Sequence, residues 1–214
     1  MNKLITILAS CCIATSVLAS EAKLETVQVG TDVPMLEKGL DAFVTNCHSC
    51  HSMKYIHYRD LVAGGMDKAK VDALRGDQPM GAALMAQMPE ADAAQAFGVP
   101  PPDLSLMAKA RDGGVNYVYS YLLGYYSGPE GSGNHIYPVT KMPDILGISN
   151  ATDAAQRTQI QGTAREIVSF LSWAADPHAG ERIRLGYYVM AYLLVLTTLL
   201  YFVKKQVWSK LPKD

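Results

Sequence analysis

The sequence of 214 residues has few cysteines, little net charge and no internal repeat. Its four cysteines are too few for a fold built on disulfides, and a formal net charge of −1 gives no indication of nucleic-acid binding. Neither a long low-complexity run nor an alternating strand pattern of useful length is present. With 49% hydrophobic and 18% charged residues, a disordered or collagen-like chain is also excluded. A mean hydropathy of +0.05 then indicates that apolar sequence is concentrated in particular segments.

The first such segment predicts a secretory signal peptide over residues 1–20. Lys3 supplies a positive start, residues 4–17 are apolar or small, and the small residues at 17–19 favour cleavage after residue 19 or 20. A permanent anchor and a lipoprotein signal, with Cys11 as the lipidated residue, are the alternatives.

The second segment, residues 185–203, is nineteen residues long and has no charge. As a helix it would be about 28 Å long, close to the hydrocarbon thickness of a bilayer. Aromatic residues stand near its ends, as in the interfacial belts of membrane helices: Tyr187, Tyr188, Tyr201 and Trp208. We therefore expect one C-terminal transmembrane helix here, with a buried core helix as the alternative.

The charges on either side predict the orientation of this helix. Lysines 204, 205, 210 and 213 follow it, against Arg182 and Arg184 before it. The positive-inside rule then predicts a single-pass protein of the bacterial inner membrane, with residues 204–214 as a cytoplasmic tail and residues 21–181 in the periplasm. Residues 21–181 hold 19 acidic and 12 basic residues, a net charge of −7. This surplus favours a basic partner, although an ordinary acidic secreted domain would also show it.

Helical periodicity predicts that the exported domain is mostly α-helical with long loops. A helix over 33–47 has apolar positions 36, 40, 43 and 44, with Thr31 or Asp32 as its cap. Further helices are expected over 67–75, 117–125 and 152–174, the last ended by Pro177. We expect irregular or short helical structure over 82–97, extended backbone at the three prolines 100–102, and a long loop over 127–150.

Two cysteines remain after removal of the signal peptide, in the sequence Cys47-His48-Ser49-Cys50-His51. This C-x-x-C-H pattern is the attachment sequence of c-type haem. Residues three and four apart share one face of a helical turn, so both sulfurs reach the vinyl groups while His51 reaches the iron. We therefore predict one covalent haem c. A redox disulfide, a structural disulfide and a zinc site are the alternatives, and zinc would need further ligands. The histidines available, none with paired spacing, are His48, His57, His135 and His178; we expect His48 and His57 to be solvated or structural.

The helix that leads into this motif has Gly39 and Phe43 at four-residue steps before Cys47. A glycine there permits a close crossing with another helix, and Phe43 can pack at the crossing. The late helix offers Phe170 and Trp173 as partners, although ordinary amphipathic packing would use the same residues.

Spacing alone does not select the second axial ligand of the iron. A methionine in this position raises the reduction potential. Met53 is too close to the motif to cross the ring. Met80, Met85 and Met88 lie at suitable separations, on a segment that could equally be helical and packed, and Met142 lies in an extended, proline-flanked loop over 137–143 that could project over the distal face. The methionines after the motif are Met53, Met66, Met80, Met85, Met88, Met107 and Met142.

Several longer motifs, in this order along the chain, resemble the cytochrome c1 family. They are Gly39–Met53, Pro101-Pro102-Asp103-Leu104-Ser105, Ala110–Gly114 with Asn116-Tyr117-Val118, Lys141-Met142-Pro143, and Phe170–Pro177. The resemblance covers nearly the whole chain after the signal peptide. It implies that Cys47 and Cys50 bind the haem covalently and that His51 and Met142 are the axial ligands of its iron.

The resemblance also implies roles for residues around the haem. Arg111 would face a haem propionate, because a guanidinium pairs bidentately with a carboxylate, and Tyr117 would line the pocket. A carbonyl of Pro101 or Pro102 would accept the N–H of the proximal histidine. The loop before Met142 is shorter than is usual in the family, so we expect this chain to depart from the family most in the distal loop.

The function implied is that of the haem subunit of a quinol–cytochrome c reductase, an oxidoreductase complex of respiration. The chain would take electrons from a Rieske iron–sulfur protein, beside cytochrome b, and pass them to a c-type cytochrome. Only an electron moves, so no catalytic acid, base or nucleophile is expected. A stand-alone tethered cytochrome and a haem-free zinc module are the alternatives.

Overall fold

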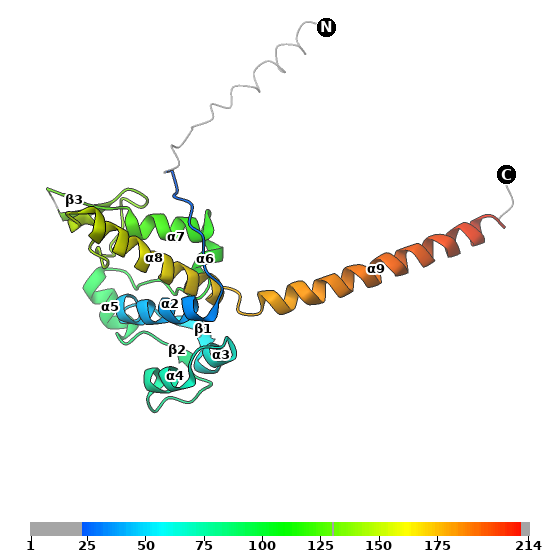
Figure 1. Cartoon of the computed structure of the whole chain (residues 1–214), viewed down its shortest axis with the longest axis horizontal. Helices are drawn as coiled ribbons and strands as arrows, with labels where there is room; N and C mark the ends of the chain where they lie inside the picture. The colour runs from blue at the N-terminus through cyan, green and yellow to red at the C-terminus, as the bar shows by residue number, and fades with distance from the viewer. Residues whose placement is uncertain (1–22, 130, 211–214) are drawn as a thin grey trace, which may run out of the picture.

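The computed structural model describes residues 23–129 and 131–210 (Figure 1). The expected signal peptide and residues 211–214 of the expected tail lie outside these residues. The described elements are α2 (Val33–Asn46), β1 (Met53–His57), α3 (Tyr58–Ala63), α4 (Lys68–Arg75), β2 (Ala83–Leu84), α5 (Glu90–Phe97), α6 (Met107–Ala110), α7 (Gly114–Leu123), β3 (Tyr125–Gly128), β4 (Gly131–Asn134), the 3₁₀ helix η1 (Ile148–Asn150), α8 (Ala154–Ala174) and α9 (Ala179–Trp208). The domain is mostly α-helical, as its periodicity predicts.

Helices α2 and α8 cross to form the centre of the core (Figure 1). Asp32 caps α2, and the side chain accepts the N–H of Met35 at 3.4 Å. At the crossing, a Cβ on Gly39 would lie 2.4 Å from the backbone oxygen of Glu166. The rings of Phe43 and Phe170 are 5.5 Å apart between centroids. The close crossing predicted for Gly39 and Phe43 is therefore present, and it brings the end of α2, where the cysteine motif begins, against α8.

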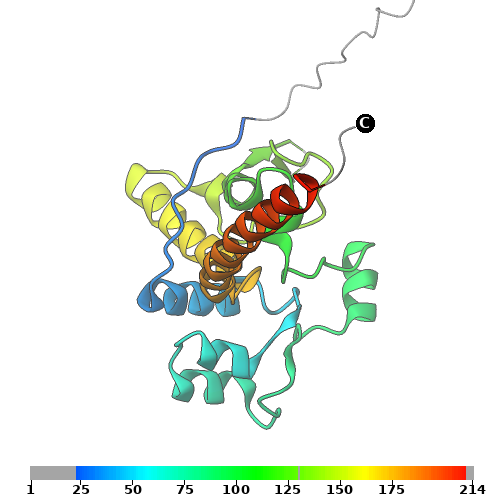
Figure 2. The ribbon, with the colours of Figure 1, turned by 90° about the vertical axis from the view of Figure 1, so that its right-hand side faces the viewer.

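An extended segment, residues 23–30, runs over α7 and α8 (Figure 2). The Ser120 hydroxyl accepts the N–H of Glu25 at 2.7 Å, and the Asn116 side chain accepts that of Val27 at 3.0 Å. On α8, the Ser169 hydroxyl accepts the N–H of Gly30 at 3.0 Å. The first described residues therefore tie α7 to α8 by polar contacts, which no hydrophobic pattern predicts.

Two small antiparallel sheets were not predicted. One pairs β1 with β2, Met53 opposite Leu84, and the other is the hairpin of β3 and β4, Tyr125 opposite Asn134. The expectation of a continuous loop over 127–150 is therefore wrong at its start, and also at η1. Helix α7 begins at Gly114 and ends at Leu123, so the helix expected over 117–125 is displaced toward the N-terminus. Strand β4 has glycine at alternate positions and no apolar side chain, so hydrophobic alternation could not reveal it.

Helix α9 leaves the domain and includes the predicted apolar segment 185–203 (Figure 1). It has 30 residues, and an 18-residue window within it has a mean hydropathy of 1.7 and no residue buried in the structure. Among the described residues it is the one helix long and apolar enough to cross a membrane. Because no residue of this window is buried, the alternative of a buried core helix is excluded.

Asp176 joins the start of α9 to the domain. Its carboxylate accepts hydrogen bonds from the Arg182 guanidinium on α9 and from the Lys109 ammonium on α6. These two cations hold the pKa of Asp176 well below its usual range. The carboxylate therefore stays charged at every pH above its lowered pKa, and both ion pairs are lost only as pH falls through that lowered value.

Replacement of Asp176 by asparagine is expected to loosen this junction without disturbing the core. Amide hydrogen exchange over residues 176–184 should become faster, while exchange in α2 and α8 stays as in the wild type. Glu181→Gln is the matched control, because among the described residues the one ion-pair partner of the Glu181 carboxylate is the His178 ring, at 3.5 Å, and both side chains are largely exposed. Equal exchange at the junction in the two variants would show that Asp176 does not fix the anchor.

Candidate haem-binding site

The cysteine motif forms a helical turn directly after α2. The N–H groups of Cys50 and His51 donate to the Cys47 carbonyl at 3.1 and 2.9 Å. This turn brings residues 47, 50 and 51 onto one face. Cys47 is 6% exposed, and burial, together with the nearby Cys50, raises the pKa of its thiol to about 12. Both sulfurs are free thiols, and the described residues contain no group of three His, Cys, Asp or Glu side chains placed to hold a metal ion. Neither disulfide alternative is formed, and a zinc site lacks its ligand set in this part of the chain.

His51 is oriented by the proline segment. Its Nδ1 lies 2.8 Å from the carbonyl oxygen of Pro102. A carbonyl can only accept, so Nδ1 carries the proton and the lone pair of Nε2 remains available to a metal. His51 is 8% exposed, and burial lowers its pKa despite the opposing effects of Pro102 and Asp103, which favours the neutral ring. Of the two prolines predicted to accept this N–H, Pro102 does so.

The residues after Pro102 are bound to the chain that follows His51. The Leu104 N–H donates to the Ser52 carbonyl at 2.9 Å. The Asp103 carboxylate accepts the N–H of Lys54 at 2.8 Å, and the Ser105 hydroxyl accepts that of Tyr55 at 3.1 Å. The Pro-Pro-Asp-Leu-Ser motif thus lies along β1, and these contacts fix the Pro102 carbonyl beside His51.

Residues 85–88 hold the other side of the motif. The His48 Nε2–H donates to the Met85 carbonyl at 2.8 Å, and the Met88 N–H donates to the Ser49 carbonyl at 3.0 Å. His57 also has a structural role, because its ring and its N–H both contact the Asp60 carboxylate at the start of α3. The prediction that these two histidines are solvated or structural is confirmed.

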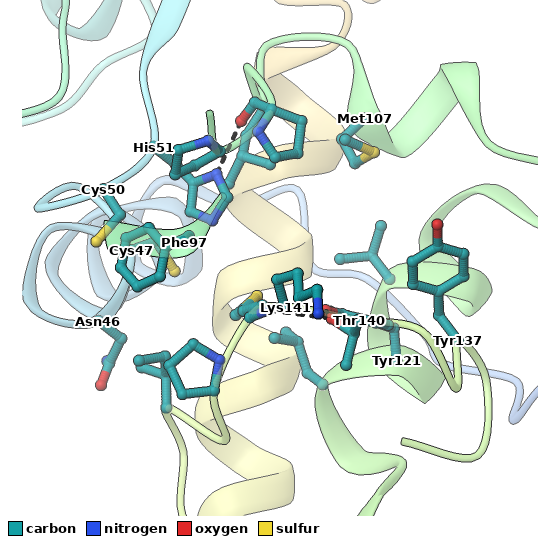
Figure 3. A pocket seen from close by; sticks show the side chains of 18 of the residues that line it. Asn46, Cys47, Cys50, His51, Phe97, Met107, Tyr121, Tyr137, Thr140 and Lys141 are labelled. Atoms are coloured by element: carbon teal, nitrogen blue, oxygen red, sulfur yellow. Dashed lines mark hydrogen bonds between the residues drawn. The ribbon is translucent and has the colours of Figure 1, made fainter. Parts of the chain in front are cut away.

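The motif faces a cavity of about 550 Å³, a size usual for ligand pockets. Cys47, Cys50 and His51 lie on one side of it, and Thr140 and Lys141 of the 137–143 loop lie on the other (Figure 3). Most of the remaining lining is apolar. All eight residues predicted for the site line this one cavity: Cys47, Cys50, His51, Pro101, Pro102, Arg111, Tyr117 and Met142.

The cavity reduces the choice of methionines to two. Met53 and Met66 are buried in the core, and none of Met80, Met85 and Met88 lines the cavity. Met107, on α6, and Met142 both line it. In Figure 3, Met107 lies level with His51 at the upper edge, whereas Lys141, which precedes Met142, lies across the cavity.

Arg111 and Tyr117 form a pair at the edge of the cavity. The Arg111 guanidinium carbon lies 5.8 Å from the centre of the Tyr117 ring, within the range of a cation–π contact. Arg111 is exposed, and in the described part of the chain it has no acidic partner within ion-pair distance. The cation is thus held beside an apolar cavity with its charge available to an anionic group of a ligand.

Sequence reasoning missed the aromatic and aliphatic rim of the cavity. Tyr121 had a signal, because it follows the predicted Tyr117 by four residues, a spacing that places both side chains on one face of α7. The other missed residues lie far apart in sequence, and only the fold brings them together: Phe97, Val99, Tyr137, Val139 and Ile145.

These residues fit a covalently attached haem. An apolar cavity suits the ring, two thiols on one face suit its vinyl groups, an imidazole with a free Nε2 suits the iron, and an unpaired guanidinium suits a propionate. Fold and site together define a c-type cytochrome domain, followed by the helix α9, which is long enough to span a membrane.

Comparison with known proteins gives the family. The profile of the Cytochrome C1 family matches residues 24–82 and 80–211. Cytochrome c1 of Allochromatium vinosum is 30% identical, covering 83% of this chain and 85% of that protein. Cytochrome b/c1 of Bradyrhizobium diazoefficiens is 31% identical over 81% of this chain and 33% of its own length. A chain from a solved structure titled hyperthermophilic respiratory Complex III is 21% identical, with a TM-score of 0.49. The match covers 99% of this chain and 98% of that chain.

The chain therefore belongs to the cytochrome c1 family. Its cofactor is haem c, for which the Cys47 and Cys50 pair followed by His51 is the covalent attachment sequence.

Proposed function

We propose that the chain is the haem-bearing electron carrier of a quinol–cytochrome c reductase. It accepts one electron from a Rieske iron–sulfur protein and passes it to a c-type cytochrome, and it is bound beside cytochrome b in the membrane. The observation that carries this proposal is the single cavity that both thiols, His51 and Met142 line. The haem, when bound, supplies one-electron chemistry through its iron. The chain alone is an electron carrier, and the complex is the enzyme.

In this proposal the residues of the cavity have distinct roles. His51 and Met142 would hold the haem iron, and the Pro102 carbonyl keeps the proton of His51 on Nδ1, so that Nε2 is free to bind a metal. Arg111 would pair with a propionate, and Tyr117 lines the pocket beside the guanidinium. The apolar walls exclude water and lower the local dielectric, which sets the reduction potential together with the ligands.

We further propose that the chain is exported and oriented as its charges predict. Residues 1–20 are removed, residues 21–181 form the periplasmic domain, residues 185–203 span the inner membrane, and residues 204–214 form the cytoplasmic tail. The length of α9 and the lysines after residue 203 support this arrangement. The fused name of the Bradyrhizobium relative, cytochrome b/c1, supports cytochrome b as a neighbour.

Purification in mild detergent tests the proposal. We expect a cytochrome b and a Rieske protein to purify with the chain, and a reduced-minus-oxidised spectrum to show haem c. Electron transfer to a basic c-type cytochrome should slow as salt concentration rises, because the domain carries a net charge of −7 over residues 21–181. A haem-loaded chain that purifies without either subunit would instead identify a stand-alone tethered cytochrome.

A further inference from the structure

Four polar contacts connect the N–H of Met142 to its own C=O through three side-chain hydroxyl groups. The Met142 N–H donates to the Thr140 hydroxyl at 3.2 Å, and that hydroxyl lies 2.5 Å from the Tyr121 hydroxyl. The Tyr121 and Tyr125 hydroxyls are 3.0 Å apart, and the Tyr125 hydroxyl lies 2.9 Å from the Met142 carbonyl oxygen. The contacts form a closed ring that begins and ends on one residue of the distal loop.

The Tyr125 hydroxyl is placed to donate to two acceptors, the Met142 carbonyl oxygen and the Tyr121 oxygen, which share its one proton. In the contact between the Tyr121 and Thr140 hydroxyls, either group can be the donor. The Thr140 hydroxyl also accepts the Met142 N–H. Both backbone polar groups of Met142 therefore have a hydroxyl partner.

The ring supplies the backbone hydrogen bonds at the centre of the loop. Before it, the Asn134 side chain accepts the N–H groups of Ile136 and Tyr137 at 2.9 and 3.1 Å. After it, the Asp144 carboxylate accepts those of residues 147, 148 and 149. Between these two anchors, in the described part of the chain, the backbone of residues 141–143 forms hydrogen bonds only with Thr140 and Tyr125.

The ring is also placed to resist movement. Tyr125 is 5% exposed and packs edge-to-face on Tyr121, with 5.7 Å between ring centroids. Tyr121 belongs to α7, which packs on α8. The two tyrosines therefore connect the Met142 backbone to the helical core and not merely to a neighbouring loop.

We propose that Tyr121, Tyr125 and Thr140 are positioning residues that keep the Met142 side chain in the cavity and thereby favour its bond to the iron. This inference rests on the proposed function, in which Met142 is an axial ligand. A side chain that is already held in place loses less conformational entropy when it binds a metal. Breaking the ring is therefore expected to raise the fraction of molecules in which Met142 is not bound to the iron.

Tyr125→Phe tests this role, because it removes one hydroxyl and keeps the buried ring. The haem-loaded, full-length protein in its oxidised state is titrated with imidazole, and binding is followed in the visible spectrum. The variant is expected to bind imidazole about fivefold to tenfold more tightly than the wild type, which corresponds to the loss of one net hydrogen bond. The absorption band of the iron–thioether bond should weaken in the same sample before imidazole is added.

The neighbouring Tyr126→Phe is the matched control. Tyr126 is exposed and stacks on His135, and among the described residues its hydroxyl forms no hydrogen bond. It should bind imidazole like the wild type. Thr140→Val breaks the ring at a second point and should increase imidazole affinity as Tyr125→Phe does. It therefore also tests the proposal if the Tyr125→Phe protein does not load haem. Because both changes open one ring, the double variant should exceed either single variant only slightly.

Met142→Leu separates failure of this inference from failure of the ligand assignment. If Met142→Leu binds imidazole far more tightly while Tyr125→Phe and Thr140→Val match Tyr126→Phe, the methionine is the ligand and the ring does not position it. If Met142→Leu also behaves as the wild type, Met142 is not a ligand, and both the assignment and the positioning role are overturned.

Discussion

Met142→Leu is expected to lower the reduction potential of the bound haem by on the order of 0.1 V, a part of the range of roughly 0.8 V that axial ligands set. Leucine fills nearly the same volume but offers no donor atom. The iron loses a thioether that favours its reduced state and becomes open to added ligands. A spectroscopic redox titration of the haem-loaded variant measures the change.

Met107→Leu is the control for this prediction, because Met107 is the other methionine that lines the cavity. The same chemical change at residue 107 should leave the potential near that of the wild type. A lowered potential in Met107→Leu together with an unchanged potential in Met142→Leu would identify Met107, on α6, as the methionine ligand of the iron. That result would contradict the role given to the distal loop.

Gly39→Ala is expected to lower the free energy of unfolding by about 2 kcal/mol or more, although alanine is the better helix former by about 1 kcal/mol. A Cβ at this position would lie 2.4 Å from the backbone oxygen of Glu166 and 2.7 Å from the Cβ of Phe170. Neither atom belongs to the movable end of a side chain, so α2 and α8 must separate. Denaturant unfolding of the haem-loaded protein measures the loss.

Gly162→Ala, on the exposed face of α8, is the matched control. Apart from the adjacent residues and the backbone of α8 itself, no atom of the described residues lies within 4 Å of the position that its Cβ would take. Because alanine causes no steric clash there, its higher helix propensity should raise the free energy of unfolding by up to about 1 kcal/mol. The opposite signs at the two glycines are the test, and a gain in stability at residue 39 would show that the helices do not cross as closely as described.

The elements that sequence predicts well are those with a helical apolar face and a cap. The helix over 33–47, the helix ending at Ala174 and the crossing at Gly39 follow from periodicity, from Asp32 and from aromatic spacing. Helix α3 was missed because His57, which caps it, is a residue outside the usual caps. The β3–β4 hairpin was missed because its second strand has glycine where strands usually have apolar side chains.

The chemistry of the site could be predicted from short motifs, because the attachment of haem needs two thiols and an imidazole on one turn. The choice among methionines could not, because it depends on which loops reach one cavity. Phe97 and Val99, at the rim, and the hydroxyls of Tyr121 and Thr140, nineteen residues apart, come together only through the tertiary fold. These contacts have no periodicity or local motif for a sequence to show.

The covalent bond between haem and Cys47 and Cys50 is tested most directly by the intact mass of the exported protein, measured after denaturation from cells that make it natively. We predict a mature chain carrying the added mass of one haem, which unfolding does not remove because thioether bonds hold it. A denatured chain with the mass of the polypeptide alone would contradict the assignment of the site and the electron-transfer role that depends on it.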